Sequence, residues 1–152
     1  MFIIWIFILV NSFYATTNSS KMSVDGIYKR IGQERSREFL INEGLSPEEA
    51  DYTIALGLEL EFKVSSNKIT RTIRAGKIHE VDDFVLGQPC QEVIARQNFT
   101  SIPSLNGNTF ILSTKRSDGS EGWSRYHYFK EDGLDVLHKA NHGEAWMYFK
   151  RL

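Results

Sequence analysis

The chain has 152 residues, of which 41% are hydrophobic and 24% are charged, and its formal net charge is −1. This length suits one domain with a substantial core and is too short for two comfortable ones. The charge balance, without a long basic run, gives no reason to expect nucleic acid or an anionic membrane surface as a partner.

The N-terminal residues form an apolar run, Phe2 to Val10, followed by polar and small residues up to Ala15. The run is too short to span a bilayer but suits the hydrophobic region of a secretory signal peptide. We expect a signal peptide over 1–15, a short polar segment over 16–24 and one domain over 25–152 of a secreted, extracellular protein. A buried N-terminal strand is the alternative interpretation of the run.

Two Asn-x-Ser/Thr sequons, at Asn18 and Asn98, agree with secretion and are the candidate glycosylation sites. The single cysteine, Cys90, excludes an internal disulfide, and we interpret it as a small buried hydrophobe. The four histidines show no metal-ligand spacing, and we find no catalytic serine motif or phosphate-binding loop. We therefore expect no metal, no cofactor and no enzymatic activity.

In chain order, the first predicted element is a strand over Asp25 to Ile31. The period then changes: a short helix is expected between Glu34 and Ile41 and ends at Gly44. A second helix follows in the stretch SPEEADYTIALG, where Ser46 is a good N-cap, Pro47 fits the first helical position and two glutamates complement the helix dipole.

After the helices, short segments alternate apolar and polar residues or are rich in β-branched side chains. Turn signals such as Asn106-Gly107 and Asp118-Gly119 separate them. The predicted strands are LELEFKV, KITRTIR, HEVDDFVLG, QEVIARQ, NTFILSTKR, WSRYHYF, LDVLHKA and EAWMYFKRL. Such a series predicts an antiparallel meander that curls into a barrel or sandwich, with the helix pair across one open end and room inside for a small ligand.

Several of these segments resemble the fatty-acid-binding protein family, the intracellular lipid-binding proteins of the calycin superfamily. GIYK is similar to the family's Gly-x-Trp-Lys, and Glu34 with Phe39 and Leu40 falls at the spacing of its first lid helix. LGQ in FVLGQPCQEV is similar to the bend of the central hairpin, where two neighbouring strands part. STKRSDGS and MYFKRL resemble a later hairpin and the closing strand.

This resemblance covers Asp25 to Leu152 and implies a ten-stranded antiparallel up-and-down β-barrel with a helix-turn-helix lid after the first strand. Lipocalins, the competing barrel family, lack this helix pair and usually carry disulfides. The resemblance implies a monomeric, non-catalytic carrier that binds and transports a long-chain fatty acid or another small hydrophobic ligand, with transient membrane contact through the lid. The alternative is a secreted barrel protein that protects against stress or desiccation and binds little lipid.

The family holds an anionic headgroup with inward arginine and tyrosine residues on its last strands. The matching positions here read Trp146-x-Tyr148, with Tyr128 on an earlier strand, so neither of the family's two arginines is present at these positions. Strand alternation would then place Tyr126 inside as well, with Arg125 and His127 in solvent. A shift of one residue would instead bring Arg125 into the cavity. The first arrangement favours neutral or bulkier lipids.

Arg71 and Arg116 align with interior positions of the family. Glu92 resembles an inward glutamate that holds water, and a solvated strand charge is the alternative. The candidate ligand-binding residues are Arg71, Thr114, Arg116, Arg125, Tyr126, Tyr128, Trp146 and Tyr148.

Overall fold

The structure is a computed structural model that describes residues 23–152. The predicted signal peptide, the sequon at Asn18 and most of the polar segment over 16–24 lie outside these residues. The elements are β1 (Gly26–Glu34), α1 (Ser36–Asn42), α2 (Pro47–Ala55), β2 (Leu58–Ser65), β3 (Lys68–Ala75), β4 (Ile78–Val85), β5 (Cys90–Ile94), β6 (Gln97–Asn106), β7 (Thr109–Arg116), β8 (Ser124–Phe129), β9 (Gly133–Ala140) and β10 (Gly143–Arg151).

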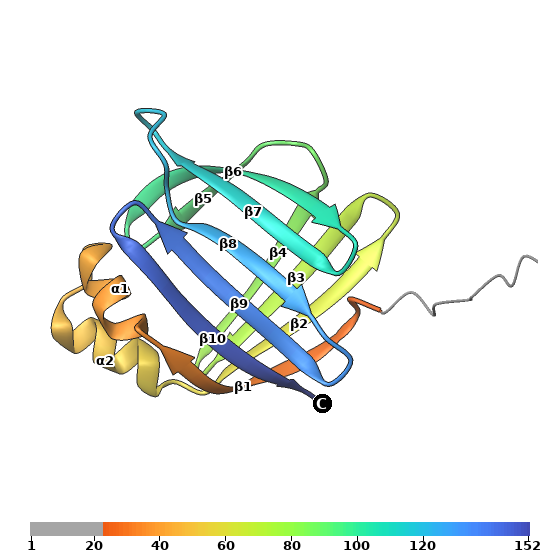
Figure 1. The fold of residues 1–152 in the computed structure, drawn as a ribbon, viewed down its shortest axis with the longest axis horizontal. Helices are drawn as coiled ribbons and strands as arrows, with labels where there is room; N and C mark the ends of the chain where they lie inside the picture. The colour runs from red at the N-terminus through yellow and green to blue at the C-terminus, as the bar shows by residue number, and fades with distance from the viewer. Residues whose placement is uncertain (1–22) are drawn as a thin grey trace, which may run out of the picture.

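The strands form one ten-stranded antiparallel sheet in the order β4-β3-β2-β1-β10-β9-β8-β7-β6-β5, which confirms the predicted barrel (Figure 1). The first and last strands of the chain pair, and a register shift between Arg30 and Gly32 bends β1 where it meets β10. Within the described residues the two edge strands, β4 and β5, share no ladder, so the sheet curls without closing.

The segment between these edges contains the predicted strand break. Gly87 has φ +80°, a conformation that glycine adopts without strain. Its backbone N–H donates to the carbonyl of Pro103 in β6 (2.8 Å), and that of Leu86 donates to the carbonyl of Asn67 (2.8 Å). These bonds fix the connection between the two halves of the barrel at the point where the neighbouring strands part.

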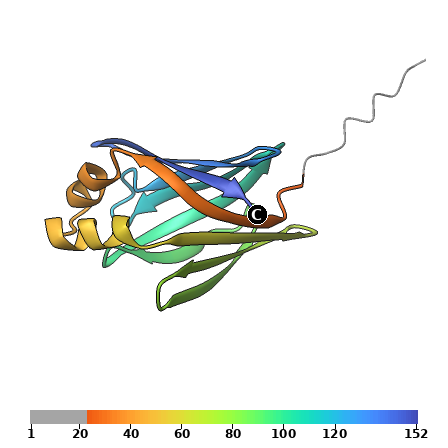
Figure 2. The ribbon, with the colours of Figure 1, turned by 90° about the horizontal axis from the view of Figure 1, so that it is seen from below.

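The helix pair covers one end of the barrel, as predicted (Figures 1 and 2). Ser46 caps α2 in a capping box with Glu49: the Glu49 N–H donates to Ser46 Oγ (3.2 Å) and the Ser46 N–H donates to the Glu49 carboxylate (2.8 Å). Phe39 and Leu40 of α1 are buried in a cluster with Trp123, which anchors the helices to the barrel. No helix among residues 23–152 is long and apolar enough to cross a membrane.

Aromatic side chains fill the opposite end. Tyr28, Phe62 and Phe129 are buried and meet edge to face, with ring centroids 5.1–6.1 Å apart. Because Tyr28 lies near the start of β1 and Phe62 lies toward the end of β2, this cluster is remote from the helices that join those strands. The interior between the aromatic cluster and the helices is left for the site described below.

One strand was not predicted. β6 lies between the predicted QEVIARQ and NTFILSTKR, and the residues Ala95-Arg96, expected within a strand, form a two-residue turn instead. Both have positive φ, +49° and +63°, which hairpins of this kind require but which asparagine and glycine adopt more easily. Arg96 donates two hydrogen bonds to Glu49 of α2 (2.7 and 3.1 Å), and this contact ties the turn to the helix pair.

Candidate functional site

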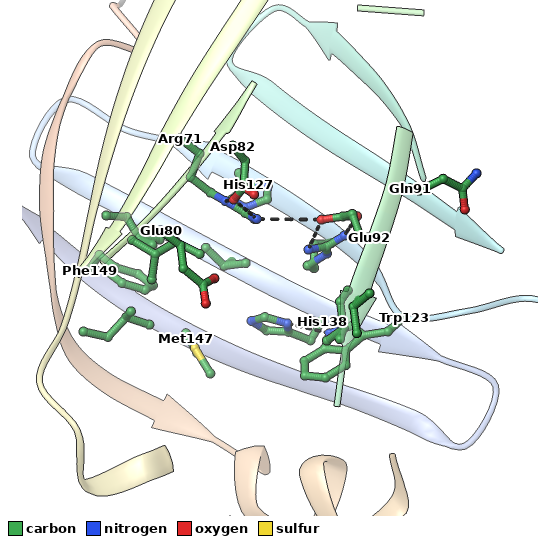
Figure 3. A pocket seen from close by; sticks show the side chains of 17 residues that line it. Arg71, Glu80, Asp82, Gln91, Glu92, Trp123, His127, His138, Met147 and Phe149 are labelled. Atoms are coloured by element: carbon green, nitrogen blue, oxygen red, sulfur yellow. Dashed lines mark hydrogen bonds and ion pairs between the residues drawn. The ribbon is translucent and has the colours of Figure 1, made fainter. Parts of the chain in front are cut away.

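A cavity of about 360 Å³ occupies the barrel interior (Figure 3). Apolar side chains from β2, β3, β9 and β10 form much of its wall: Leu58, Leu60, Ile73, Val136, Met147 and Phe149. Charged and polar side chains from β3, β4, β5, β8 and β9 form the rest, so the cavity has a hydrophobic wall and a polar wall. This division is typical of sites that hold a small amphiphilic molecule.

The polar wall is organised by two ion pairs that meet. Arg71 of β3 donates from Nε and Nη2 to one carboxylate oxygen of Asp82 on β4 (3.1 and 2.7 Å). Arg125 of β8 binds both carboxylate oxygens of Glu92 on β5, one of them at 3.1 Å. Arg71 also lies 3.7 Å from Glu92, so the four side chains form one network from four strands (Figure 3).

This network is largely removed from solvent: the side chains of Arg71 and Arg125 are 8% exposed and that of Glu92 is 10% exposed. Burial alone would raise the pKa of Glu92. The positive charge of Arg125 and hydrogen bonds from Arg125 and Ser101 outweigh burial, and the pKa lies below its usual value. Glu92 is therefore ionised at neutral pH, and arginine side chains in general keep their positive charge in proteins.

Hydroxyl groups extend the network into the wall. Ser101 of β6 donates to Glu92, and its Oγ lies 2.8 Å from Oγ1 of Thr114 on β7. The Thr114 N–H in turn donates to Oγ of Ser124 (2.9 Å). Thr114 is fully buried but does not line the cavity, so it supports the network from behind.

Two buried histidines complete the polar wall. Nδ1 of His127 lies 3.1 Å from the carbonyl of Phe110, and Nδ1 of His138 lies 2.8 Å from the indole N–H of Trp123. Burial, reinforced by the charges of Arg71 and Arg125, lowers the pKa of His127 well below its usual value and that of His138 to about 3. Both rings are therefore neutral at neutral pH.

On its solvent side, the cavity is bounded by the two edge strands, β4 and β5, which do not pair with each other. Glu80 of β4 and Gln91 and Val93 of β5 line it and are exposed. The position of these residues indicates that the cavity reaches solvent between β4 and β5.

Four of the candidate residues lie on the outer face of the barrel. Tyr126, Tyr128, Trp146 and Tyr148 lie half-buried on the outer face, where neighbouring rings stack with centroids 6.0–6.5 Å apart. The preferred orientation of β8 and β10 was therefore wrong by one residue, and the alternative with Arg125 inside is the one observed. The physical reason is that Glu92 and Ser101 supply Arg125 with buried partners, whereas the stacked rings cover one another outside.

Of the three candidate arginines, two line the cavity and one does not. Arg71 and Arg125 line the cavity, but Arg116 lies outside it, toward the helices. Arg116 donates to both carboxylate oxygens of Glu43 (3.1 and 3.2 Å), a residue at the end of α1 whose side chain is fully buried. Glu43 also lies 2.7 Å from Nε2 of His142, in the turn before β10. Arg116 thus fastens the helix pair to the barrel rim.

Sequence reasoning did not single out Asp82, His127 or His138 as site residues, although Arg71 and Glu92 were noted. Alternation along SRYHYF places His127 on the same face as Arg125, so the correct register would have found it. Asp82 lies directly opposite Arg71 in the β3–β4 pairing. The hairpin formed by the predicted strands KITRTIR and HEVDDFVLG would therefore have brought the two residues together. Cys90 is half-buried and packs against the core, as interpreted.

Comparison with known proteins gives structural matches only. No family model and no curated protein matches the sequence. Among solved structures, the fatty-acid-binding protein isolated from Manduca sexta is 21% identical and superposes with a TM-score of 0.74, covering 84% of this chain and 99% of its own. The fatty-acid-binding protein from brain tissue of Drosophila melanogaster is 19% identical, with a TM-score of 0.74 and coverage of 82% and 95%.

Human cRBP IV is 10% identical, with a TM-score of 0.77 and coverage of 86% of this chain and 98% of its own. At these identities, similarity establishes architecture and not activity. The match spans almost the whole length of each protein and includes both the barrel and the helix pair. The chain therefore has the fold of the fatty-acid-binding proteins.

Proposed function

We propose that this protein binds and transports a small hydrophobic ligand, such as a long-chain fatty acid or another lipid, in the barrel cavity and catalyses no reaction. The observation that carries the proposal is the interior cavity of about 360 Å³, with one apolar wall and one polar wall. Ligand pockets in proteins span about 300–1,000 Å³, so the cavity suits a slender molecule. Two of the structural neighbours described above are named for fatty-acid binding, which supports the same ligand class.

The energetics favour an apolar chain as the main source of affinity. Each methylene transferred from water into the cavity contributes up to ~0.8 kcal/mol, and a long acyl chain roughly 10 kcal/mol before the costs of ordering are subtracted. One charge-assisted hydrogen bond adds about 1.5–3 kcal/mol. The hydrocarbon chain thus supplies binding energy, while the polar wall selects the polar end of the ligand.

We further propose that this binding takes place outside the cell. The support is the apolar run over Phe2 to Val10 with Ala15 after it, together with the sequon at Asn98, which is exposed on β6. Expression of the full chain in eukaryotic cells tests it. Secretion of a shortened protein whose mass falls on enzymatic removal of N-glycans supports the proposal. Retention of an uncleaved chain in the cell contradicts it.

The binding test is native mass spectrometry of the purified protein with identification of extracted lipids, followed by titration of the delipidated protein. Val136→Trp and Leu137→Trp form a matched pair, because Val136 is buried against the cavity and Leu137 lies on the outer face of the same strand. We expect Val136→Trp to lose ligand and Leu137→Trp to retain it. Equal binding by both variants would show that ligand lies elsewhere.

A second function is favoured by one specific observation: four charged side chains already fill part of the interior with mutual ion pairs. A barrel filled in this way suits the alternative of a stress- or desiccation-protective protein with little lipid binding. Recovery of soluble protein after boiling, combined with no lipid in the native mass spectrum, would favour that function over transport.

A further inference from the structure

We propose that the cavity selects an uncharged amphiphile whose polar group accepts hydrogen bonds, such as an ester, ketone or alcohol, and discriminates against a free carboxylate. This inference rests on the proposed ligand-binding function and specifies the chemical class of the ligand. It is carried by two independent observations: the charge balance of the polar wall and the kind of hydrogen-bonding group that this wall leaves unpaired.

The charge balance of the ion-pair network is zero. Arg71 and Arg125 supply two positive charges, and Asp82 and Glu92 supply two negative charges. Arg71 is held by two hydrogen bonds to Asp82, and Arg125 is held by both oxygens of Glu92. A ligand carboxylate would therefore meet arginines that are already neutralised, and would add an unbalanced negative charge to a buried region, which is strongly unfavourable.

The unpaired groups of the polar wall are donors. Nε of Arg125 and Nε2 of His138 are buried and have no hydrogen-bond partner within the described residues. The Trp123 indole donates to Nδ1 of His138, so the proton of the neutral ring resides on Nε2. Both side chains line the cavity, but the two N–H groups themselves are covered, so an acceptor reaches them only after the side chains shift. Two buried N–H donors without acceptors call for an oxygen acceptor, and an uncharged carbonyl, ether or hydroxyl oxygen supplies one without changing the charge balance.

The same unpaired atoms distinguish this site from the rest of the interior. Among residues 23–152, the other buried side-chain atoms without partners belong to Gln33, Ser36 and Arg151, none of which lines the cavity. An ordered water on the two donors is the competing occupant, and it would leave no preference between ligand headgroups. The test must therefore compare headgroups on one hydrocarbon chain.

Three probes serve for the delipidated protein: hexadecanoate, methyl hexadecanoate and hexadecane. Their dissociation constants are measured at neutral pH by displacement of an uncharged fluorescent probe. We expect the methyl ester to bind at least about tenfold more tightly than hexadecanoate, and also more tightly than hexadecane, because only the ester offers an acceptor without a charge. Hexadecanoate binding as tightly as the ester would overturn the inference. No binding of any probe would overturn the proposed function itself.

Glu92→Gln provides a gain-of-function test. It removes one negative charge from the network, and Arg125 becomes free to bind an anion. We expect hexadecanoate affinity to rise by about tenfold while ester affinity changes little. Glu131→Gln is the matched control: it removes the same charge at an exposed residue that does not line the cavity, so the ester preference should persist.

Two further variants keep the inference falsifiable if Glu92→Gln fails to fold. Asp82→Asn frees Arg71 instead, at a carboxylate that is 35% exposed, and should likewise favour hexadecanoate. His138→Phe preserves the ring but removes the Nε2 donor, and should weaken the ester by about tenfold while leaving hexadecane unchanged. An unchanged ester affinity in folded His138→Phe would contradict the role of this donor.

Discussion

We predict that the two buried histidines, His127 and His138, make the protein less stable in mild acid. This loss begins at a pH well above that at which carboxylates are protonated. The pKa of His127 is lowered well below 6.5 and that of His138 to about 3, first by burial and then by the nearby arginine charges. In the unfolded chain both rings take up a proton near pH 6.5, whereas the folded protein keeps them neutral. The unfolded state therefore binds more protons below this pH, and stability falls as pH falls.

The magnitude follows from the linkage relation. A histidine that stays neutral in the folded protein contributes up to about 1.4 kcal/mol per pH unit below 6.5. For His138, whose folded pKa is about 3, this integrates to about 2 kcal/mol between pH 7.5 and 5.0. His127 adds a further loss in the same direction, and the total is a sizeable share of the roughly 5–15 kcal/mol typical of a domain. The loss from His138 continues until the pH approaches its folded pKa of about 3 and is then constant.

Urea unfolding at a series of pH values measures this effect. With a slope of about 2 kcal/mol per molar urea, the midpoint should fall by more than about 1 M between pH 7.5 and 5.0. His127→Phe keeps a ring among the neighbouring aromatic side chains and should reduce the pH dependence, apart from a constant offset for the lost contact with Phe110. His79→Asn, at an exposed position of β4, is the control. A midpoint independent of pH, or an undiminished dependence in His127→Phe, would refute the reasoning.

Three other substitutions probe the helix end and the central turn, each by urea unfolding at pH 7.5. Glu43→Gln should lower the free energy of unfolding by about 2–3 kcal/mol, because Arg116 loses a fully buried partner; the exposed Glu48→Gln should cost far less, and equal effects would contradict the role of the contact. Gly87→Ala should cost about 1 kcal/mol through its positive φ alone, since no atom lies within 4 Å of the added Cβ, and an unchanged stability would argue against this backbone conformation. Ser46→Ala should cost about 1 kcal/mol and Ser46→Gly only a few tenths, an order that a purely packing role would reverse.

The helix pair and most strands could be predicted because their signals are local. Ser46 followed by proline and two glutamates specifies a helix start by short-range chemistry, and the observed α2 begins at Pro47. The hairpin between β5 and β6 lacked such a signal. Ala95 and Arg96 do not favour the positive φ that they adopt, and Pro103 cannot donate to a ladder, so the segment did not read as a strand. The hydrogen bond of Arg96 to Glu49, which is distant in sequence, helps to offset the strain of this turn.

The candidate site was harder to predict because alternation shows which residues share a face of a strand but not which face is inside. On β8, one face carries Arg125 and His127 and the other carries Tyr126 and Tyr128. Hydropathy favours tyrosine inside and arginine outside. The observed choice depends on Glu92, which lies 33 positions away in the chain and gives Arg125 its buried partner. No local pattern contains that pairing.

Of the two strands whose orientation was predicted wrongly, β8 also carries charge into the cavity, through Arg125. A buried guanidinium lowers stability unless the surrounding residues satisfy it, and here Asp82 of β4, Glu92 of β5 and Ser101 of β6 do so. Apolar residues at the charged positions of the cavity wall, like those on β2 and β10, would be sufficient for packing. Departures of this kind from the simplest pattern are expected where a protein does its work. The position of Arg125 therefore supports the polar wall of the cavity as the specificity-determining part of the site, and directs mutagenesis there rather than to the stacked rings outside.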